Sequence, residues 1–460
     1  MPRIATLLLF AVCLGVLPMR AEDRDSMVIH IDSVRITGND RTRDEVILRE
    51  IPFAFPADLT MADFEYIRNR LTNLFLFNRA RLVVEESDDG NVLHIELTET
   101  LHIYPVPILF LNDRSWDKVS AGFQVTHINF RGMNERLGVG GWLGHNPSFF
   151  VNYSNPWIGR QRLLLGFDTF GKRVSNKFVE SLESARESGD TLRTFTGYGL
   201  EERHLGVGMT IGRRLNLHSS IQAFIGVRRI VIPERLPESL ARFEGRHVVP
   251  KFELAFRSDY RDLYEYPRSG FLIQWKGTRS GLGGTAFPFW RLNLDHRVYL
   301  PLGSRVSLGM RNGTTLNSTN PPIYDRTFIG FGERVRGHFY DDEVAGQHRM
   351  MHSAEMRISL LPIRYFSVDD APVMPNLFQQ LKYGLSMGLF VDSGIVWGES
   401  DRLMDGDLRE TDRPLSLRNH ITGYGVGLHI HLPYVYLLRL DHAWDEDGRG
   451  EWILEAGVTF

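Results

Sequence analysis

The stretch Phe289-Trp290-Arg291-Leu292-Asn293-Leu294-Asp295-His296-Arg297-Val298-Tyr299-Leu300 alternates apolar with polar residues. Successive side chains of a β-strand point to opposite faces, so this segment predicts a strand with one apolar and one charged face. The apolar face carries Trp290, Leu292, Leu294 and Val298, interrupted only by His296. The charged face carries Arg291, Asn293, Asp295 and Arg297. A soluble sandwich would bury the apolar face and a membrane barrel would turn it to lipid, and this strand alone fits either.

The same alternation recurs along the C-terminal three quarters of the chain. Segments 387–397, 424–432 and 452–460 each place aliphatic and aromatic residues on one face and glycine, histidine or charged residues on the other. Repeated strands of about ten residues with this pattern are typical of membrane barrels. We predict sixteen antiparallel strands, at 103–111, 118–130, 135–145, 147–155, 161–173, 203–215, 219–231, 248–260, 270–280, 287–300, 304–316, 349–362, 383–397, 420–432, 435–444 and 451–460.

The lengths of the connections agree with a barrel that crosses an outer membrane. Such barrels have an even number of strands, short periplasmic turns and longer extracellular loops. The connections on the side of the N-terminal domain are mostly short: 131–134, 156–160, 216–218, 301–303 and 433–434, with 363–382 as the exception. Those on the other side include the long ones: 174–202, 232–247, 317–348 and 398–419.

Composition and the N-terminus indicate an exported protein. Residues 1–21 are predicted to be a signal peptide, with Arg3 before an apolar stretch. The single cysteine, Cys13, lies in that segment, so the mature chain would have no disulfide. Beyond the signal we find no apolar run of about 18 residues, the length of a helical span. The net charge of −3 is too balanced to suggest nucleic-acid binding.

Residues 24–101 are predicted to form a separate α/β domain before the barrel. A strand is expected at 28–36, with a bulge or a strand break near Asp32-Ser33, where the alternation changes. Thr42 is expected to cap a helix that ends near Glu50, and a second helix is expected over 61–77. Two further strands, at 80–86 and 92–98, complete the domain.

Two short motifs predict a loop folded into the barrel. The first is Val335-Arg336-Gly337-His338-Phe339, inside the long connection 317–348. The second is Phe390-Val391-Asp392-Ser393-Gly394, which places Asp392 on the polar face of a predicted strand. An arginine can clamp a carboxylate with two parallel hydrogen bonds, so Arg336 and Asp392 are expected to pair in the lumen. Arg336 as an ordinary solvated loop residue is the alternative.

The remaining polar motifs give no catalytic or cofactor site. His429 and His431 share a strand face without a third ligand nearby, so we expect neither a metal site nor another cofactor. No nucleophile, base and oxyanion-stabilising group can be assembled from the spacing, and no enzymatic activity is predicted. Charged residues on the predicted lumen face either neutralise one another or line a polar path for an unfolded chain.

The two ends of the barrel sequence predict its seam. Pro105 and Pro107 lie at the start of the first strand, and proline cannot donate to a β-ladder. They either weaken the junction with the last strand or simply end the linker before the first strand. In the last strand, Val458 and Phe460 are expected to face lipid, with the terminal aromatic residue as a signal for membrane assembly.

These motifs jointly resemble the BamA/TamA-type superfamily of outer-membrane assembly and translocation barrels, the bacterial surface antigen family. Val34–Asn39 followed by Val46–Glu50 looks like the opening of a POTRA domain, of which this chain would have one. The matching barrel segments are Tyr153–Trp157, Asp259–Gly270, the Val335–Phe339 loop motif and its partner Phe390–Gly394. His338 departs from the family, which usually has an aromatic residue there.

The resemblance implies a protein that inserts or translocates proteins at the outer membrane without nucleotide energy, with its POTRA domain in the periplasm. Its partners would be unfolded outer-membrane or secreted proteins, membrane lipid, and a periplasmic chaperone or accessory lipoprotein. A dedicated two-partner-type secretion pore and a passive porin or receptor are the alternatives.

Overall fold

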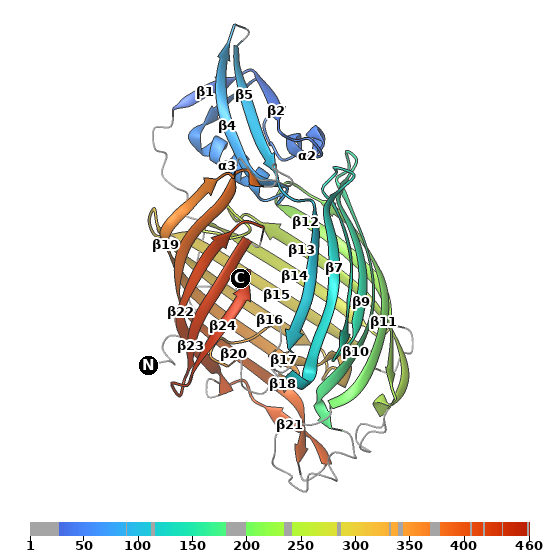
Figure 1. Ribbon diagram of the computed structural model, residues 1–460. Coiled ribbons are helices and arrows are strands. Elements are labelled where there is room, and N and C mark those ends of the chain that lie inside the picture. Colours follow the sequence, from blue (N-terminus) through green and yellow to red (C-terminus); the bar gives the residue numbers. More distant parts are fainter. Residues whose placement is uncertain are drawn as a thin grey trace.

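The computed structural model describes residues 27–88, 90–111, 116–180, 199–233, 242–282, 287–330, 333–338, 344–368, 378–404, 407–416, 419–434, 436–457 and 460. The predicted signal segment 1–21, Phe339 and Val458 lie outside them. Figure 1 shows a small N-terminal α/β unit above one mouth of a large β-barrel. The mouth beside this unit is called the near end below, and the opposite mouth the far end.

The N-terminal unit packs two helices against a small sheet. Strand β2 (Ser33–Thr37) runs parallel to β5 (Gly90–Glu99), which pairs antiparallel with β4 (Phe77–Ser87). A separate two-stranded sheet joins β1 (Val28–Ile31) to β3 (Ala57–Thr60). The predicted first strand is therefore two strands that separate at Asp32, where the alternation changes. The core lies between sheet and helices and is built from fully buried aliphatic residues that include Ile47, Ile67, Leu71, Leu93 and Ile95.

Both predicted helices are present, but the cap of the first differs from the prediction, and the second ends at Thr72 rather than near residue 77. Helix α2 (Asp44–Leu48) has Arg43 as its N-cap residue, without a side-chain cap. Thr42 instead donates to Glu99 (Oγ1–Oε1 2.6 Å), because it lies against β5 rather than over the first helical turn. Helix α3 (Met61–Thr72) has the complete capping box, between Thr60 and Asp63.

The barrel wall has the predicted sixteen antiparallel strands, closed into a ring. Their observed bounds are β6 (Ile103–Leu111), β7 (Val119–Phe130), β8 (Glu135–Gly144), β9 (Ser148–Ile158), β10 (Leu163–Glu180), β11 (Gly199–Arg214), β12 (Ser219–Ile232), β13 (Gly245–Asp259), β14 (Gly270–Ser280), β15 (Phe289–Pro301), β16 (Val306–Asn317), β19 (His348–Phe366), β20 (Leu381–Met404), β22 (Ile421–Leu432), β23 (Tyr436–Asp445) and β24 (Gly450–Ala456). Short 3₁₀ turns, η2 (Trp116–Lys118) and η4 (Ile323–Asp325), lie in two far-end connections.

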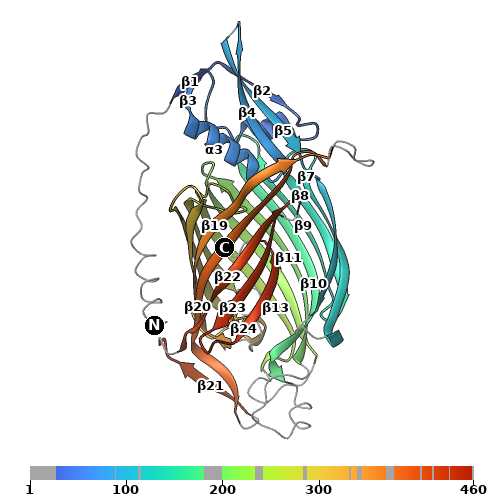
Figure 2. The same cartoon turned by 60° about the vertical axis from the view of Figure 1, so that its left-hand side comes forward.

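Some hairpins extend well past the wall. Strand β20 continues beyond the far end and pairs there with β21 (Asp407–Arg413), which hangs from the mouth opposite the N-terminal unit (Figures 1 and 2). At the near end, β19 and β20 reach Phe366 and Leu381. In the connection 363–382, expected to be a long loop, residues 363–366 and 381–382 thus belong to this hairpin, and 369–377 lie outside the described residues.

Burial in the barrel is inverted relative to a soluble protein. On β11, the outward side chains of Leu205, Val207, Met209 and Ile211 are all exposed, whereas inward Glu202 and His204 are buried. An exposed apolar belt around a buried polar interior is the arrangement that a lipid-embedded barrel needs. Among the described residues, no helix is long and apolar enough to cross a membrane.

Candidate functional site

A long connection from the far end folds back into the barrel. Its two short strands, β17 (Thr327–Ile329) and β18 (Val344–Gly346), pair with each other and lie against β20 (Figure 1). Between them, the segment 333–338 carries Arg336 into the wall. The loop is anchored by a small apolar cluster of Ile329, Val335, Met351 and Val396, in which Val335 is fully buried.

Arg336 makes a two-pronged contact with Asp392, the partner expected from the sequence. Its Nε donates to Asp392 Oδ2 (2.6 Å) and its Nη2 to Asp392 Oδ1 (3.0 Å). The backbone N–H of Arg336 donates to the same carboxylate (3.3 Å). The guanidinium carbon lies 3.5 Å from the ring centroid of Phe390, so the first residue of that motif supplies a cation–π contact. Arg336 and Asp392 are only 2% and 1% exposed, so water contributes little to their solvation.

Two further carboxylates converge on Arg336. Its Nη1 donates to Glu355 Oε2 (2.9 Å) on β19 and to Asp441 Oδ2 (3.4 Å) on β23. Glu355 also accepts from Arg357 Nε (2.8 Å), and Asp441 accepts from Arg439 Nη1 (3.1 Å). Three arginines thus face three buried carboxylates across four elements. The sequence placed Glu355 and Asp441 on the lumen face but gave no sign that they reach the loop.

Gly337 and His338 of the loop motif pack against the barrel wall and fix the direction of the loop. Gly337 has φ +101°, and a Cβ atom there would lie 2.7 Å from the carbonyl oxygen of Trp444. Its N–H donates to Glu451 (2.8 Å). His338, which stands where the family usually has an aromatic residue, contacts Glu446 (Nε2–Oε2 2.8 Å) near the far-end mouth. Phe339 lies outside the described residues.

Glycines on the wall let the loop approach closely. A Cβ atom at Gly423 would lie 1.6 Å from the carbonyl oxygen of Arg336. A Cβ atom at Gly394 would crowd Ile329, Met351 and Val335 at 2.8–3.0 Å. The glycine of the Phe390–Gly394 motif is therefore required by the loop that packs against it, not by a turn in the strand.

Phe460 corrects one expectation, because it lies inside the barrel rather than toward lipid. Strand β24 ends at Ala456, and Gly457 adopts φ +102°, which breaks the alternation that placed Phe460 outside. Phe460 is 1% exposed and stacks near Tyr299 of β15 (ring centroids 6.4 Å apart). Its carbonyl oxygen accepts from Arg357 Nη2 (3.3 Å). Val458, predicted to face lipid as well, lies outside the described residues.

The prolines lie within the first barrel strand and face the seam. Strand β6 pairs with β7 along its whole length, and the N–H of Ile128 donates to the carbonyl oxygen of His102 (2.8 Å). Backbone groups alternate direction along a strand, so even-numbered residues bond β7 and odd-numbered ones point away from it. Pro105 and Pro107 therefore remove two donors on the side of β24, the neighbour that closes the ring.

The N-terminal unit is bound to the turns of the near-end mouth. Tyr66 of α3 bonds His218 (Oη–Nε2 2.8 Å), and Asn73 donates to the carbonyl oxygen of Asp262 (2.9 Å). On the other side, Arg79 donates to Gln380 (Nη1–Oε1 2.6 Å) beyond the β19–β20 hairpin. These contacts reach three separate turns, so the unit covers part of the opening.

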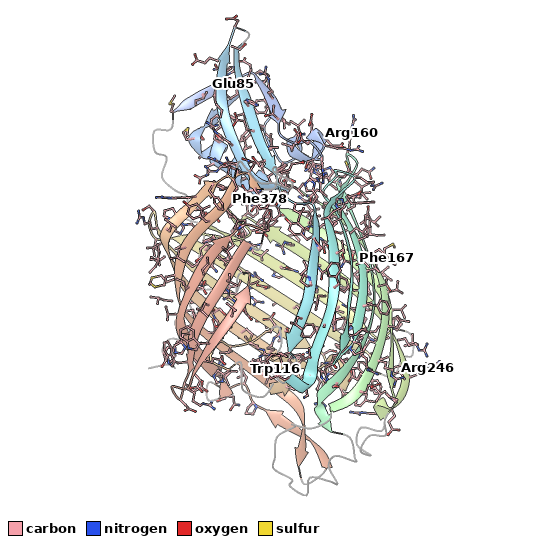
Figure 3. All side chains as sticks on the ribbon, viewed as in Figure 1. Glu85, Trp116, Arg160, Phe167, Arg246 and Phe378 are labelled. Carbon is pink, nitrogen blue, oxygen red and sulfur yellow. The ribbon has the colours of Figure 1, made fainter. Side chains whose placement is uncertain are left out.

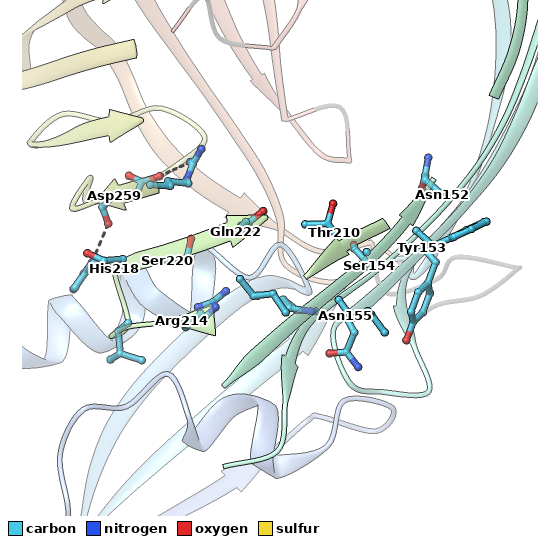
Figure 4. A pocket seen from close by; sticks show the side chains of 18 of the residues that line it. Asn152, Tyr153, Ser154, Asn155, Thr210, Arg214, His218, Ser220, Gln222 and Asp259 are labelled. Atoms are coloured by element: carbon cyan, nitrogen blue, oxygen red, sulfur yellow. Dashed lines mark hydrogen bonds and ion pairs between the residues drawn. The ribbon is translucent and has the colours of Figure 1, made fainter. Parts of the chain in front are cut away.

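A cavity of about 440 Å³ with a mixed polar and apolar lining lies at the near end of the lumen. Figure 4 shows amide and hydroxyl side chains that line it from β9, β11 and β12, among them Asn152, Ser154, Thr210 and Gln222, with Arg214 and Asp259 at its edge. Asp259 is paired with Arg261 (Nη2–Oδ2 2.8 Å). The lining offers hydrogen bonds to a passing backbone.

His429 and His431, which share a strand face, contact other side chains. His429 Nδ1 lies 2.8 Å from the Tyr266 hydroxyl, and His431 Nε2 lies 3.2 Å from Ser386 Oγ. Across the described parts of the chain, no group of three or more His, Cys, Asp or Glu side chains is arranged to hold a metal ion.

Comparisons with known proteins agree with this architecture. BamA from Haemophilus ducreyi lacking POTRA domains 1–3 is similar over 93% of this chain and 83% of that one, with 15% identity and a TM-score of 0.51. CdiB from Acinetobacter baumannii covers 93% of this chain and 73% of its own, with 12% identity and a TM-score of 0.49. CdiB from Escherichia coli covers 97% and 92%, with 11% identity and a TM-score of 0.46. Residues 129–460 match the model of the Omp85 superfamily domain, and the chain therefore belongs to the Omp85 superfamily of outer-membrane β-barrels.

Proposed function

We propose that this protein inserts or translocates other proteins at the bacterial outer membrane, without nucleotide energy. The observation that carries the proposal is the seam, where Pro105 and Pro107 remove donors between the first and last strands. Each backbone hydrogen bond contributes only about 0.5–1.5 kcal/mol net, so the loss of two brings opening of this junction within reach of thermal motion. An insertase that releases chains sideways requires such a junction, and a porin gains nothing from it.

In the same proposal, the N-terminal unit is a POTRA domain that lies in the periplasm and comprises residues 24–101. The barrel comprises residues 103–460, and its far end then lies at the cell surface. Strand β4 is an edge of the small sheet, so its free backbone groups can bond an extended segment of an unfolded substrate. The cavity beneath the unit would receive that segment next.

The network around Arg336 has a structural role in this mechanism. It holds the far-end loop inside the lumen. We propose no catalytic residue and no cofactor, since this network and the seam are sufficient for sideways release of a chain. Unfolded outer-membrane or secreted proteins would be the substrates, with a periplasmic chaperone or lipoprotein to deliver them.

A reversible staple across the seam tests the proposal. Cys13 is replaced, one cysteine is placed at Phe110 of β6, and a second is moved through positions 453–457 until a disulfide forms. We expect oxidation to abolish assembly of substrate barrels into proteoliposomes and reduction to restore it. The matched control is a staple between β10 and β11, at Thr169 and Val207, which are paired in the wall. Full activity of the stapled seam would contradict sideways release and favour transport through the lumen, as in a dedicated secretion pore.

The POTRA assignment has its own test. Residues 24–101 expressed alone should be soluble and should melt cooperatively, because α3 buries Ile67 and Leu71 against the unit's own sheet, with the barrel residue Ile128 packed at the edge of this core. A fragment without a cooperative thermal transition would contradict the boundary but not the seam mechanism.

A further inference from the structure

Five successive wall strands each carry an outward arginine toward the far end. The residues are Arg173 of β10, Arg203 of β11, Arg229 of β12, Arg246 of β13 and Arg279 of β14. We call this group the arginine band. Figure 3 shows Arg246 at the outside of the barrel near the far end, whereas Phe167 lies higher on the same outer wall.

The register places all five on the lipid side of the wall. Arg173 is directly opposite Arg203, and Leu205, two residues further along β11, is opposite Arg229. Arg246 is opposite Val231, and Arg279 is opposite Phe252 of β13. These neighbours belong to the outward face, since Leu205 and Phe252 are exposed. The strands of a barrel are tilted, so a level around its circumference runs diagonally across the register and joins these positions.

The band has few acidic partners. Glu201 accepts from Arg203 (Nε–Oε1 2.7 Å) and lies 3.8 Å from Arg173 Nε. Within the described residues, Arg229, Arg246 and Arg279 have no carboxylate partner. Arg279 lies over the ring of Trp290, an exposed aromatic residue of the next strand (5.3 Å to the centroid). The guanidinium groups thus end the apolar belt with uncompensated positive charge.

Four strands nearer the seam differ at the same end. Near the far-end termini of β8, β9, β22 and β24, the exposed outward side chains are Leu143, Phe149, Tyr424 and Trp452. The strands on both sides of the seam therefore present apolar and aromatic side chains, and the opposite wall presents arginine. A uniform interfacial ring would not show this division.

We propose that the arginine band binds the phosphate groups of a phosphorylated glycolipid in the outer leaflet. Guanidinium forks match phosphate oxygens with paired hydrogen bonds, and the apolar stripe of β10–β14 below them fits the acyl chains of the same molecule. The spread over five strands suits a headgroup with more than one phosphate. Lipid held on this wall would fix the barrel's orientation while leaving the seam wall free to deform the membrane. This inference rests on the proposed orientation of the barrel, and not on its transport activity.

The test measures lipid retention by the full chain. The protein is reconstituted into phosphatidylethanolamine nanodiscs that contain bis-phosphorylated lipid A, and bound lipid is counted by native mass spectrometry. We expect bis-phosphorylated lipid A to be retained and its dephosphorylated form to be lost. The triple variant Arg229→Gln, Arg246→Gln, Arg279→Gln should retain at least about tenfold less, because hydrogen bonds to charged groups are lost.

Matched variants and ligands decide between explanations. Arg160→Gln with Arg213→Gln removes two exposed arginines from the near end, where Figure 3 shows Arg160 beside the N-terminal unit, and should leave retention unchanged. Heat-modifiable migration of each variant checks that its barrel is folded. Equal retention of the dephosphorylated lipid, equal retention of phosphatidylglycerol, or an equal loss in the near-end variant would each overturn the proposal. Displacement of lipid A by millimolar inorganic phosphate would overturn the requirement for a lipid.

Discussion

Arg336 joins segments that are far apart in the sequence, because its guanidinium meets carboxylates from β19, β20 and β23. A buried ion pair often contributes little net stability. Removing one partner is nevertheless costly, because it leaves the other charge buried without a counter-charge and without water. Loss of Arg336 leaves Asp392 without its arginine, while Glu355 keeps Arg357 and Asp441 keeps Arg439. Loss of Asp392 leaves Arg336 with two other carboxylates, so we expect the loss of the arginine to cost more.

Single and double substitutions at this pair should be strongly non-additive. We expect Arg336→Ala to destabilise the folded barrel by about 3–5 kcal/mol and Asp392→Ala by less, with the double variant close to Arg336→Ala alone. The free energy of unfolding in detergent, measured with urea, gives these values. Arg297→Ala, a less buried lumen arginine paired with Asp295, is the control and should cost less. Additive losses would mean that the two residues act separately.

The buried ring of Phe460 should stabilise the end of the last strand. Phe460→Ala removes its contacts with Tyr299 and Arg357, which corresponds to about 1.5–3 kcal/mol for a buried aromatic side chain. We expect faster hydrogen exchange in β24 and slower assembly of the protein itself, seen as precursor that stays protease-sensitive. Phe460→Leu keeps most of the buried apolar area, so its exchange and assembly rates should lie between those of the unchanged protein and those of Phe460→Ala. Unchanged exchange in β24 would show that the ring does not hold the strand.

At the scale of elements, the junction between β6 and β24 lacks two backbone donors in a wall where other neighbouring strands share long registers. Between β10 and β11, for example, fifteen residue pairs are aligned. On β6 the odd-numbered positions point to the seam, and two of them are proline. The weakness is therefore built into the covalent structure of one strand.

Restoring donors to the seam should make the barrel more stable and less active. Pro105→Val with Pro107→Val adds two N–H groups on the seam side, worth about 1–3 kcal/mol together if β24 accepts from both. We expect a higher temperature for heat modification and slower substrate assembly. Pro250→Val, in β13 on the opposite wall, is the matched control because it adds a donor away from the seam. Its activity should remain normal, and equal losses in both variants would remove the seam as the cause.

At the scale of the whole molecule, the N-terminal unit and the barrel meet through polar contacts at separate turns. His218 occupies one of them: its Nδ1 donates to the carbonyl oxygen of Asp259 (3.0 Å), so its Nε2 accepts from the Tyr66 hydroxyl. Burial lowers the pKa of His218 below its usual range. The imidazole is therefore neutral when the unit is docked, and protonation removes the acceptor that Tyr66 uses.

Docking of the unit should weaken in acid. The contribution of His218 is complete above its undocked pKa of about 6.5 and is lost as the pH falls through the lowered docked value. Spin labels on α3 and on the β13–β14 turn should report longer distances at pH 5 than at pH 7.5. His218→Gln should flatten this dependence, while His30→Gln, an exposed histidine on the far side of the unit, should not. A pH response that survives His218→Gln would assign it to other groups.

The sequence determined the wall of this barrel because its information is local. A period of two in polarity, interrupted by turns, is the direct consequence of alternate side chains facing lipid and lumen, so all sixteen strands could be found without contacts. The same alternation put Arg336 in a far-end loop and Asp392 on the inner wall, where the structure brings them together.

Only the tertiary structure decided what depends on residues meeting across the lumen or between units. Gly457 has a positive φ just after the end of β24, and Phe460 is buried inside the barrel, against the alternation of its strand. The convergence of Glu355 and Asp441 on Arg336 follows from the curvature of the barrel, which a periodic sequence pattern does not predict. The docking of Tyr66 on His218 joins positions 152 residues apart. Such contacts are set by closure of the sheet and by packing of one unit on another. Neither can be predicted from the alternation of residues along a single strand.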